Sequence, residues 1–555
     1  MNTSTALSHP LAAGVETTTT AWSAPAAALL PPELIALLAD CHRRFNPRRL
    51  ELLQARQQRQ SAYNTGGLPS YDSDQTEAVR GSWRVAPVPA DLRVRRVEIT
   101  GPINSIKMVI NMLTRNAEGV RADTAMLDFE DSMKPSWRNV ISGLQNAIGA
   151  ADGSLSLITP EKTYRLNPDD MPVVMIRVRG LHLAETNLLI DGVPISGGLF
   201  DFVASFFHTA RRLVARGKTP KFYIPKTEHH LEAKWWNDLF VAVQTALGLP
   251  IGTLRATFLI ETLPGAFQLE EILYEFREHA AGLNVGRWDK IFSDIKVLRR
   301  HPDRIMADRA TITMGKPWMD NYAKRLIKTC HERGAYAIGG MSAFTPGRTA
   351  ELREKQMAKV MADKANEFAI GHDGCWVSHP FFIGPALGQF KREHQIDRLL
   401  PEFPRYPDIL PRGESPHTIE GLRINVRVGI AYQNGWNQDI GCVSWDNLME
   451  DLATLEISRS QTWQWLHHRI TLDDGRQVTP ELLRSLFVEE LTKILAEVET
   501  EMAKASPAAR NSIAAGFRRA ADDALSAYLQ PELSDFLSLA SAPAPAGWAD
   551  APLGT

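Results

Sequence analysis

Eight short apolar runs, each ending in polar residues, glycine or proline, recur between residues 95 and 380 of this 555-residue chain. Segments with helical patterns, such as 203–217 and 318–333, fill the gaps. Strands that alternate with helices predict a parallel sheet with helical connections. The runs are RRVEITG (95–101), AMLDFED (125–131), VVMIRVRG (173–180), KFYIPK (221–226), ATFLIET (256–262), AGLNVGRWD (281–289), AYAIGGMSA (335–343) and GCWVSHP (374–380).

Eight such units predict an α/β fold of the (β/α)8 barrel type, which takes about 250 residues in its usual form. A doubly wound sheet is the rival prediction. It is less favoured because no GxGxxG or P-loop motif follows the first run. The barrel is therefore expected over residues 93–400.

The segments outside the predicted barrel lack the alternation of strands and helices. The N-terminus is rich in Thr, Ala and Pro, and Pro-Pro then opens a helical pattern followed by a second helix around 47–60. Beyond the barrel, a Pro-rich connector leads to a continuous helical pattern. The predicted parts are a disordered tail (1–30), a helical clasp (31–92), the connector (401–417), an all-helical plug domain (418–540) and a flexible tail (541–555).

Composition excludes several classes of function. The net charge is −2, so no overall field would recruit nucleic acid or an acidic membrane. No apolar run approaches the roughly 20 residues of a membrane helix, and the N-terminus lacks a secretory signal. The four cysteines form no CxxC pair, which favours a reducing compartment. We expect a cytoplasmic protein, with its oligomeric state left open.

The active site of a barrel of this kind lies at the C-terminal ends of its strands. That rule reduces the chain to a short set of candidate residues. They are Asp128, Glu130, Asp131, Ser132, Arg177, Arg179, Gly180, Lys226, Glu261, Gly286, Arg287, Trp288, Asp289, His379 and Pro380.

Glu261 and Asp289 follow adjacent strands of the predicted barrel. Neighbouring strands lie about 4.8 Å apart, so the two carboxylates can reach one ion. Oxygen ligands with no nearby cysteine favour Mg²⁺. The alternative is that each carboxylate caps a helix or pairs with an arginine. The adjacent histidines at 229–230 and 467–468 point apart on a helix and are expected to be solvated.

Arg179 precedes a glycine at a strand end. A guanidinium fixed there can bind a carboxylate or stabilise a developing oxyanion. An ion pair with the acidic cluster is the other interpretation, and the two roles are compatible.

The segment LMEDLATLEISR (448–459) predicts a helix with two adjacent acids in its first turn. At about 100° per residue, Asp451 borders the apolar stripe, whereas Glu450 points to solvent. A partly desolvated carboxylate has a raised pKa and suits a general base. The alternative is an acid placed there by the helix dipole.

Nine motifs in order, between about residue 83 and residue 540, make the chain resemble malate synthase, specifically its compact A isoform. The motifs are RRVEITGP, DFEDS, RVRGLHLAE, FYIPKTE, ATFLIETLPGAFQLEEILYE, GLNVGRWDKIFSDIK, GGMSAF, GHDGCWVSHP and MEDLATLEISRSQTWQWLHH. The family's arginine motif has proline where this chain has Val178, and the extra domain of the G isoform is absent.

The resemblance implies a barrel with a helical clasp and plug. It also implies the Mg²⁺-dependent condensation of acetyl-CoA with glyoxylate and water to malate and CoA, a step of the glyoxylate cycle. The residues implied are the metal ligands Glu261 and Asp289, the catalytic and substrate-binding Arg179, the catalytic base Asp451, the glyoxylate-binding backbone of Gly286, Arg287, Trp288 and Asp289, and the acetyl-CoA contacts Ser132 and Pro380.

Two other readings stay open at this point. Another acyl-CoA lyase on a similar barrel is disfavoured by the C-terminal helical domain. A non-catalytic CoA-binding protein is disfavoured because Glu261, Asp289, Arg179 and Asp451 are all present.

Overall fold

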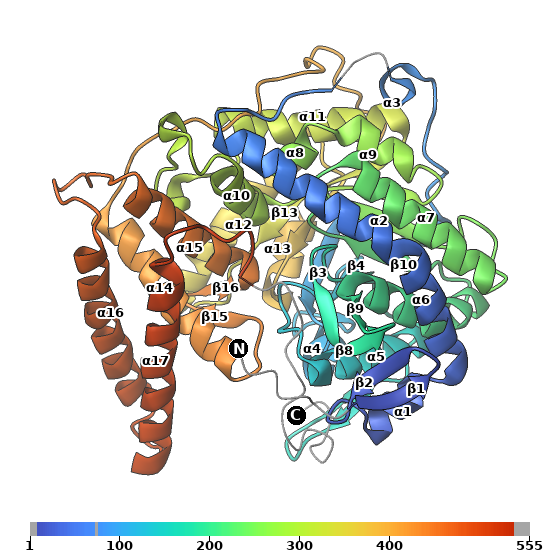
Figure 1. Ribbon diagram of the computed structural model, residues 1–555, viewed down its shortest axis with the longest axis horizontal. Helices are drawn as coiled ribbons and strands as arrows, with labels where there is room; N and C mark the ends of the chain where they lie inside the picture. The colour runs from blue at the N-terminus through green and yellow to red at the C-terminus, as the bar shows by residue number, and fades with distance from the viewer. Residues whose placement is uncertain (1–7, 73–75, 538–555) are drawn as a thin grey trace.

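A closed barrel of eight parallel strands forms the centre of the computed structural model, which describes residues 8–72 and 76–537 (Figure 1). Around the barrel the order is β10-β11-β12-β13-β14-β3-β4-β7, and the ring closes where β7 pairs with β10. Strand β14, the last barrel strand in the sequence, pairs with β3, the first. All eight predicted strands and the predicted barrel are confirmed. Their bounds are β3 (Val97–Pro102), β4 (Thr124–Asp128), β7 (Val173–Arg177), β10 (Lys221–Ile224), β11 (Arg255–Ile260), β12 (Ala280–Val285), β13 (Tyr336–Ser342) and β14 (Gly374–Val377).

The barrel strands are apolar along their length because both of their faces are buried. Inward side chains such as Met126, Met175, Tyr223, Leu259 and Trp376 fill the interior. Outward side chains pack against a ring of helices. The longer ones are α5 (Trp137–Asp152), α6 (Gly197–Ala215), α7 (His230–Ala246), α10 (Arg287–Val297), α11 (Pro317–Arg333) and α12 (Ala350–Ile370), and the shorter ones α4 (Ile106–Met112), α8 (Leu263–Ala266), α9 (Leu269–Glu275) and α13 (Ile383–Leu387).

The N-terminal region departs from the prediction. Residues 8–30 are not a disordered tail, because they form β1 (Ser8–Ala12), β2 (Val15–Thr18) and α1 (Ala24–Leu29). Strand β2 pairs with the hairpin β8 (Ala184–Ile190) and β9 (Val193–Ser196), which leaves the barrel after β7. Strand β1 pairs with β2, and β2 also pairs with β8 far along the chain, a contact that local composition could not reveal. Residues 1–7 lie outside the described part.

One helix, α2 (Pro32–Asn64), replaces the two helices expected in the clasp. Pro47 lies inside it and removes one helical hydrogen bond. Leu34, Leu38 and Leu52 are buried on both sides of that proline, and their packing keeps the helix continuous. In Figure 1 α2 lies along the barrel flank beside α6 and α7. The short α3 (Glu77–Arg80) follows.

The plug is mostly helical, as predicted, but it also contains an unpredicted hairpin. Its core gathers Leu422, Ile430, Leu483 and Phe517 from the plug helices, and in Figure 1 it flanks the barrel on the α10 side. The predicted C-terminal tail 541–555 lies outside the described residues. The elements are α14 (Ile419–Asn437), β15 (Val443–Trp445), β16 (Leu448–Glu450), α15 (Leu452–His467), α16 (Pro480–Glu501) and α17 (Pro507–Tyr528).

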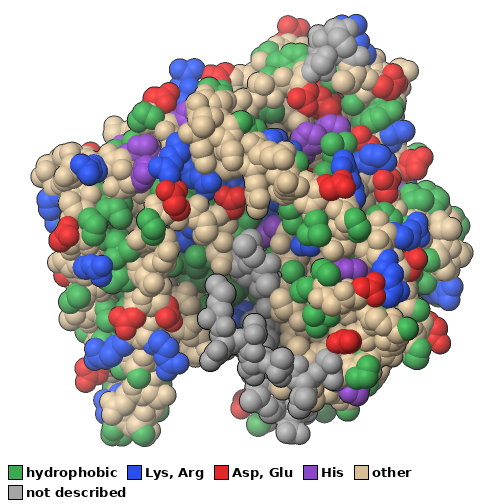
Figure 2. Space-filling view, in the orientation of Figure 1, with side chains coloured by type: hydrophobic (Ala, Val, Ile, Leu, Met, Phe, Trp, Pro, Cys, Tyr) green, Lys and Arg blue, Asp and Glu red, His purple; other side chains and the backbone are tan. Residues whose placement is uncertain are grey.

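The surface carries acidic and basic side chains side by side on the face seen in Figure 2. Within the ranges that the structure describes, no helix has the length and apolar character needed to span a membrane. The cytoplasmic location stays a prediction.

Candidate active site

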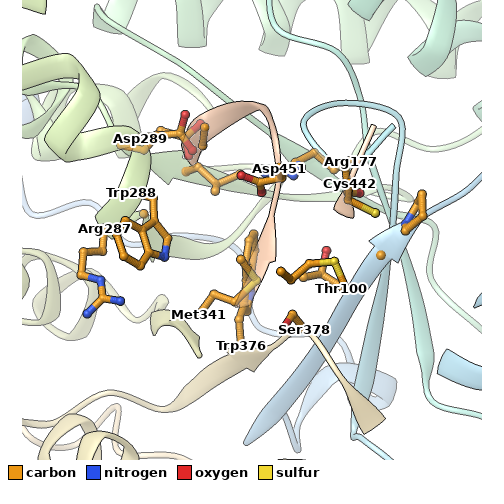
Figure 3. A pocket seen from close by; sticks show the side chains of 18 of the residues that line it. Thr100, Arg177, Arg287, Trp288, Asp289, Met341, Trp376, Ser378, Cys442 and Asp451 are labelled. Atoms are coloured by element: carbon orange, nitrogen blue, oxygen red, sulfur yellow. The ribbon is translucent and has the colours of Figure 1, made fainter. Parts of the chain in front are cut away.

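A cavity of about 50 Å³ lies at the C-terminal ends of the barrel strands, where the plug meets the barrel (Figure 3). Barrel residues and plug residues both line it. In Figure 3 Asp451 of the plug lies between Asp289 and Arg177 of the barrel. The charged side chains in its wall are Arg177, Glu261, Arg287, Asp289 and Asp451.

Of the two arginines in the RVRG motif, Arg177 is the one that lines the cavity. Strand register places it directly beside Asp128, and its Nε and one terminal nitrogen each donate to that carboxylate at 2.7 Å. Burial alone would raise the pKa of Asp128, but the charge and hydrogen bonds of Arg177, with those of Ser132, lower it below its usual value. The pair therefore stays ionised, and Asp128 fixes the direction of the guanidinium.

Arg179, the predicted catalytic arginine, does not line the cavity. Its side chain is fully buried and donates to Asp201 at 2.7 and 2.8 Å and to Glu185 at 2.8 Å. Strand β7 ends at Arg177, so the chain has turned before it reaches Arg179. Arg179 therefore joins β7 to the start of α6 and to the hairpin, and it does not reach the cavity in which its predicted roles in catalysis and substrate binding would be performed.

A buried carboxylate cluster occupies the same end of the barrel. The Lys226 ammonium lies 2.6 Å from Asp131, 3.0 Å from Glu130 and 3.1 Å from Asp289. The Lys226 backbone N–H donates to Glu261 at 2.8 Å. Burial raises the pKa of Glu261 well above its usual value, the charge of Asp289 adds to this rise, and Lys226 opposes it. One lysine thus compensates only part of the negative charge.

The residues present fit a divalent cation. Glu261 keeps a buried oxygen, Oε2, that accepts no hydrogen bond, and the buried Oδ1 of Asp289 has the Lys226 ammonium beside it at 3.1 Å. A Cβ at Gly286 would lie 2.9 Å from Glu261 Oε2, so the glycine keeps space open there. In residues 8–72 and 76–537, no group of three or more His, Cys, Asp or Glu gathers as a complete ligand set. A Mg²⁺ ion held by two carboxylates and completed by water and substrate suits that arrangement.

The first turn of α10 faces the same cavity. Gly286 is its N-cap, and no side chain caps the helix there. The first N–H groups of a helix lack intrahelical partners and favour an anion. Gly286, Arg287, Trp288 and Asp289, predicted together from one motif, are thus brought together beside Glu261.

Asp451 faces the cavity from the N-cap position of α15. Its Oδ1 accepts from the Thr454 backbone at 3.2 Å, and the Thr454 hydroxyl accepts from the Asp451 backbone N–H at 3.0 Å. This capping box starts the helix at Leu452, not at the predicted Leu448. Residues Leu448–Glu450 are instead strand β16.

Glu450 is buried, which corrects the prediction that it points to solvent. Arg309 donates to it at 2.9 Å and also to the backbone of Thr454 and the hydroxyl of Ser458. The helical wheel failed because Glu450 lies in a hairpin whose turn, Asp446–Asn447, has two positive φ angles. Glu450 thus supports the plug, and Asp451 alone of the two acids lines the cavity.

Burial raises the pKa of Asp451 to about 8. The negative charges of Asp131 and Asp289 add to this effect, and Arg177 and the Thr454 N–H oppose it. A cation bound beside Asp289 would lower that pKa again. Asp451 therefore has the affinity for a proton that a general base needs near neutral pH.

A second cavity, of about 730 Å³, adjoins the first and shares Thr100, Met108, Ser378 and Met449 with it. Pro380 lines this larger cavity, whereas Ser132 lines the smaller one and donates to Asp128 at 2.5 Å. The two predicted acetyl-CoA contacts thus lie in neighbouring cavities. Lys162, Tyr164 and Arg165, from the hairpin β5 (Ser156–Ile158) and β6 (Thr163–Arg165), line the outer part.

Several lining residues had no predicted role. Arg177 was detectable only as a strand-end candidate, because its place beside Asp128 depends on a register that pairs Ala125 with Val174 and that the sequence does not give. Cys442, Met449, Met341 and Trp376 carried no such signal, since packing between distant segments brings them to the cavity.

Comparisons with known proteins show the family that the chain resembles. Three family profiles match: "Malate synthase, TIM barrel domain" over residues 173–399, "Malate synthase, C-terminal" over 416–543 and "Malate synthase, N-terminal domain" over 15–77. Malate synthase of Myxococcus xanthus is 46% identical over 85% of this chain and 87% of its own length. Malate synthase A of Escherichia coli is 43% identical over 85% of this chain and 89% of its own length.

Among solved structures, a malate synthase from Haloferax volcanii in a pyruvate/acetyl-CoA ternary complex covers 78% of this chain at 13% identity, with a TM-score of 0.46.

Proposed function

This chain belongs to the malate synthase family, and we propose that the cavity between barrel and plug performs the family's reaction. The reaction joins the methyl carbon of acetyl-CoA to the aldehyde carbon of glyoxylate, and water then releases CoA from the thioester to leave malate. The match to malate synthase A supports the A isoform seen in the motifs.

One observation carries the proposal. Asp451, Arg177, Glu261 and Asp289 all line a single cavity, although they come from four elements spread over the chain. The set supplies a base, a fixed positive charge and two ligands for a hard cation. These are the groups needed to form an enolate and to add it to an aldehyde.

Asp451 takes a proton from the methyl group of acetyl-CoA. Its raised pKa makes it a stronger base than an exposed aspartate. Negative charge develops on the thioester oxygen as the proton leaves, and the Arg177 guanidinium stabilises that charge. Asp128 holds the guanidinium in place through two hydrogen bonds.

Glu261 and Asp289 would hold Mg²⁺, because both carboxylates are buried in the cavity wall and Oε2 of Glu261 accepts no hydrogen bond. When bound, Mg²⁺ supplies a Lewis acid that polarises the glyoxylate carbonyl and orients it. The N-terminus of α10 binds the glyoxylate carboxylate, because its N–H groups at Arg287 and Trp288 lie beyond an uncapped Gly286. Glyoxylate held there would have its aldehyde within the cavity that Asp451 also lines.

Acetyl-CoA occupies the larger cavity, with its acetyl group directed into the smaller one. Pro380 lines the entrance, and its carbonyl accepts from Asn116 at 3.0 Å. Lys162 and Arg165 on the β5–β6 hairpin give the outer wall positive charge for the CoA phosphates. Ser132 lies at the inner end.

Release of free thiol from acetyl-CoA, measured with and without glyoxylate and with Mg²⁺ or a chelator, tests the proposal. We expect release only when glyoxylate and Mg²⁺ are both present. Glu261→Ala should lose the response to Mg²⁺. Release that ignores glyoxylate would favour another acyl-CoA enzyme, and no release under any condition would favour a non-catalytic CoA-binding protein.

A further inference from the structure

After α17 the chain turns back over α15, as the deep red trace in Figure 1 shows. Residues 532–537 run between α15 and the end of α10. We name them the C-terminal strap. Nothing in the proposed reaction uses the strap, yet it touches both helices that begin in the catalytic cavity.

The strap is bound to the end of α10 by two arginines. Arg299 donates to the carbonyl of Leu533 at 2.8 Å and to Asp535 at 2.9 Å. Arg300 pairs with Glu532 at 2.6 Å. The side chain of Arg299 is 11% exposed and that of Arg300 is 31% exposed, so the Arg299 contacts are the stronger anchor.

The other side of the strap is bound to α15. Arg459 donates to the hydroxyl of Ser534 at 3.2 Å and to its carbonyl at 3.1 Å. The backbone N–H of Leu537 donates to Glu456 at 2.7 Å. Arg459 and Glu456 also pair with each other and are buried, so the strap completes a network inside the interface.

Phe536 enters the molecule between these two anchors. Its ring stacks on His182, with centroids 3.9 Å apart and an angle of 17° between the planes. Burial lowers the pKa of His182 well below its usual value, so the stacked imidazole is neutral. The Lys296 ammonium lies 4.7 Å from the Phe536 centroid. The ring forms one wall of a small cavity whose other walls include Asp131, Lys226 and Asp289.

The position of this contact matters because of where the two helices begin. Helix α10 carries the metal ligand Asp289 in its first turn, and α15 begins directly after the base Asp451. Their facing residues come from barrel and plug, which are also joined by an isolated β-bridge between Phe344 and Leu448. The distance between ligand and base therefore depends on how firmly α10 and α15 hold together.

We propose that the strap fixes α10 against α15, and that Phe536 is a positioning residue that closes the carboxylate cavity to water. This inference rests on the proposed roles of Asp289 and Asp451. Phe536 touches neither substrate. It acts indirectly, through its contact with His182 and through the two helices. Without its ring, the cavity would open and α10 would be held less firmly against α15.

Phe536→Ala, Phe536→Leu and Leu537→Ala form the test set in the full-length chain. A misplacement of about 1 Å can cost about 100-fold in rate, so we expect kcat of Phe536→Ala to fall about tenfold or more. The KM for acetyl-CoA should stay within about twofold, because the CoA cavity lies elsewhere. Phe536→Leu should restore most of the rate. Leu537→Ala removes a partly exposed side chain but keeps its N–H bond, and should match the unaltered chain.

Amide hydrogen exchange gives a second readout that needs no turnover. Exchange in residues 452–456 and 287–291 should speed up in Phe536→Ala and stay unchanged in Leu537→Ala. If Phe536→Ala does not fold, Ser534→Ala combined with Asp535→Ala removes two side-chain acceptors and should give the same exchange pattern.

Unchanged exchange together with an unchanged kcat in Phe536→Ala would overturn the proposal. So would an equal loss in Leu537→Ala. Failure of the proposed function looks different, because the unaltered chain would then release no thiol with glyoxylate while the exchange experiment still reports on the strap.

Discussion

Asp451 combines a structural and a chemical duty in one side chain. Its Oδ1 caps α15, while its carboxylate faces the cavity beside Arg177. A cap needs only an oxygen acceptor, whereas a base needs a negative charge. The two duties can therefore be separated by substitution.

Asp451→Asn should abolish proton abstraction but keep the helix cap, because asparagine caps as well as aspartate. We expect no exchange of deuterium from solvent into the acetyl-CoA methyl group and nearly unchanged stability. Asp451→Ala should lose both, at about 1 kcal/mol for the cap. Retained exchange in Asp451→Asn would refute the base assignment.

The two arginines of RVRG should respond in opposite ways. Loss of a group that stabilises an oxyanion costs about 10²- to 10³-fold in kcat, so Arg177→Gln should lose turnover by that order. Arg179→Gln removes the guanidinium that pairs with Asp201 and Glu185 and should cost about 3–5 kcal/mol of stability. Steady-state kinetics and urea unfolding measure the two effects. If both variants fold well and lose turnover equally, the assignment of catalysis to Arg177 and of a structural role to Arg179 is contradicted.

Among the elements, the barrel strands were predictable and the plug hairpin was not. An apolar run bounded by polar residues is a local signal, and the barrel has eight. The hairpin strands have three residues each, and the leucines at 448, 452 and 455 match helical spacing by coincidence. Glu450 is buried only because Arg309, 141 residues away, reaches it. Contacts over such distances leave no periodic pattern in a sequence.

Helix α11 offers a pH-dependent prediction at the level of one element. His331, near its C-terminus, donates from Nδ1 to the carbonyl of Arg398 at 2.7 Å and from Nε2 to Asp373 at 3.0 Å. Only an imidazolium can donate from both nitrogens. Burial alone would lower the pKa of His331, but the bond and charge of Asp373 raise it above its usual value.

The His331 contribution to stability is therefore complete below the unfolded pKa of about 6.5 and disappears as pH rises through the higher folded value. We expect His331→Gln to cost more free energy of unfolding at pH 6 than at pH 9, by urea titration of both proteins. If the unaltered chain exceeds His331→Gln in free energy of unfolding by the same amount at both pH values, a charged His331 in the folded state is excluded.

At the scale of the whole molecule, the site joins parts that the sequence keeps far apart. The barrel supplies Arg177, Glu261 and Asp289, and the plug supplies Asp451. The order of parts along the chain was predictable from strand rhythm and proline content. Which side of the barrel the plug covers was not, because that depends on the buried contacts of α15 with α10 and with the loop at 304–309.

Mg²⁺ should stabilise the folded chain, since the two carboxylates come together only in the barrel. A ligand at 100 times its Kd adds about 2.7 kcal/mol. We expect the urea midpoint to rise with Mg²⁺, and the rise to be absent in Glu261→Gln. Sodium chloride at equal ionic strength is the control. An equal rise with sodium, or in Glu261→Gln, would exclude a specific site.

The closure of the barrel has a consequence for the making of the protein. Strand β14, which closes the barrel against β3, ends at Val377, so every barrel strand is translated before residue 451. Domains generally fold as units during synthesis, the N-terminal ones first. A chain that stalls or is cut in the connector therefore holds the proposed metal ligands but no proposed base. Such fragments are expected to sequester metal without consuming acetyl-CoA, so that turnover reports complete translation.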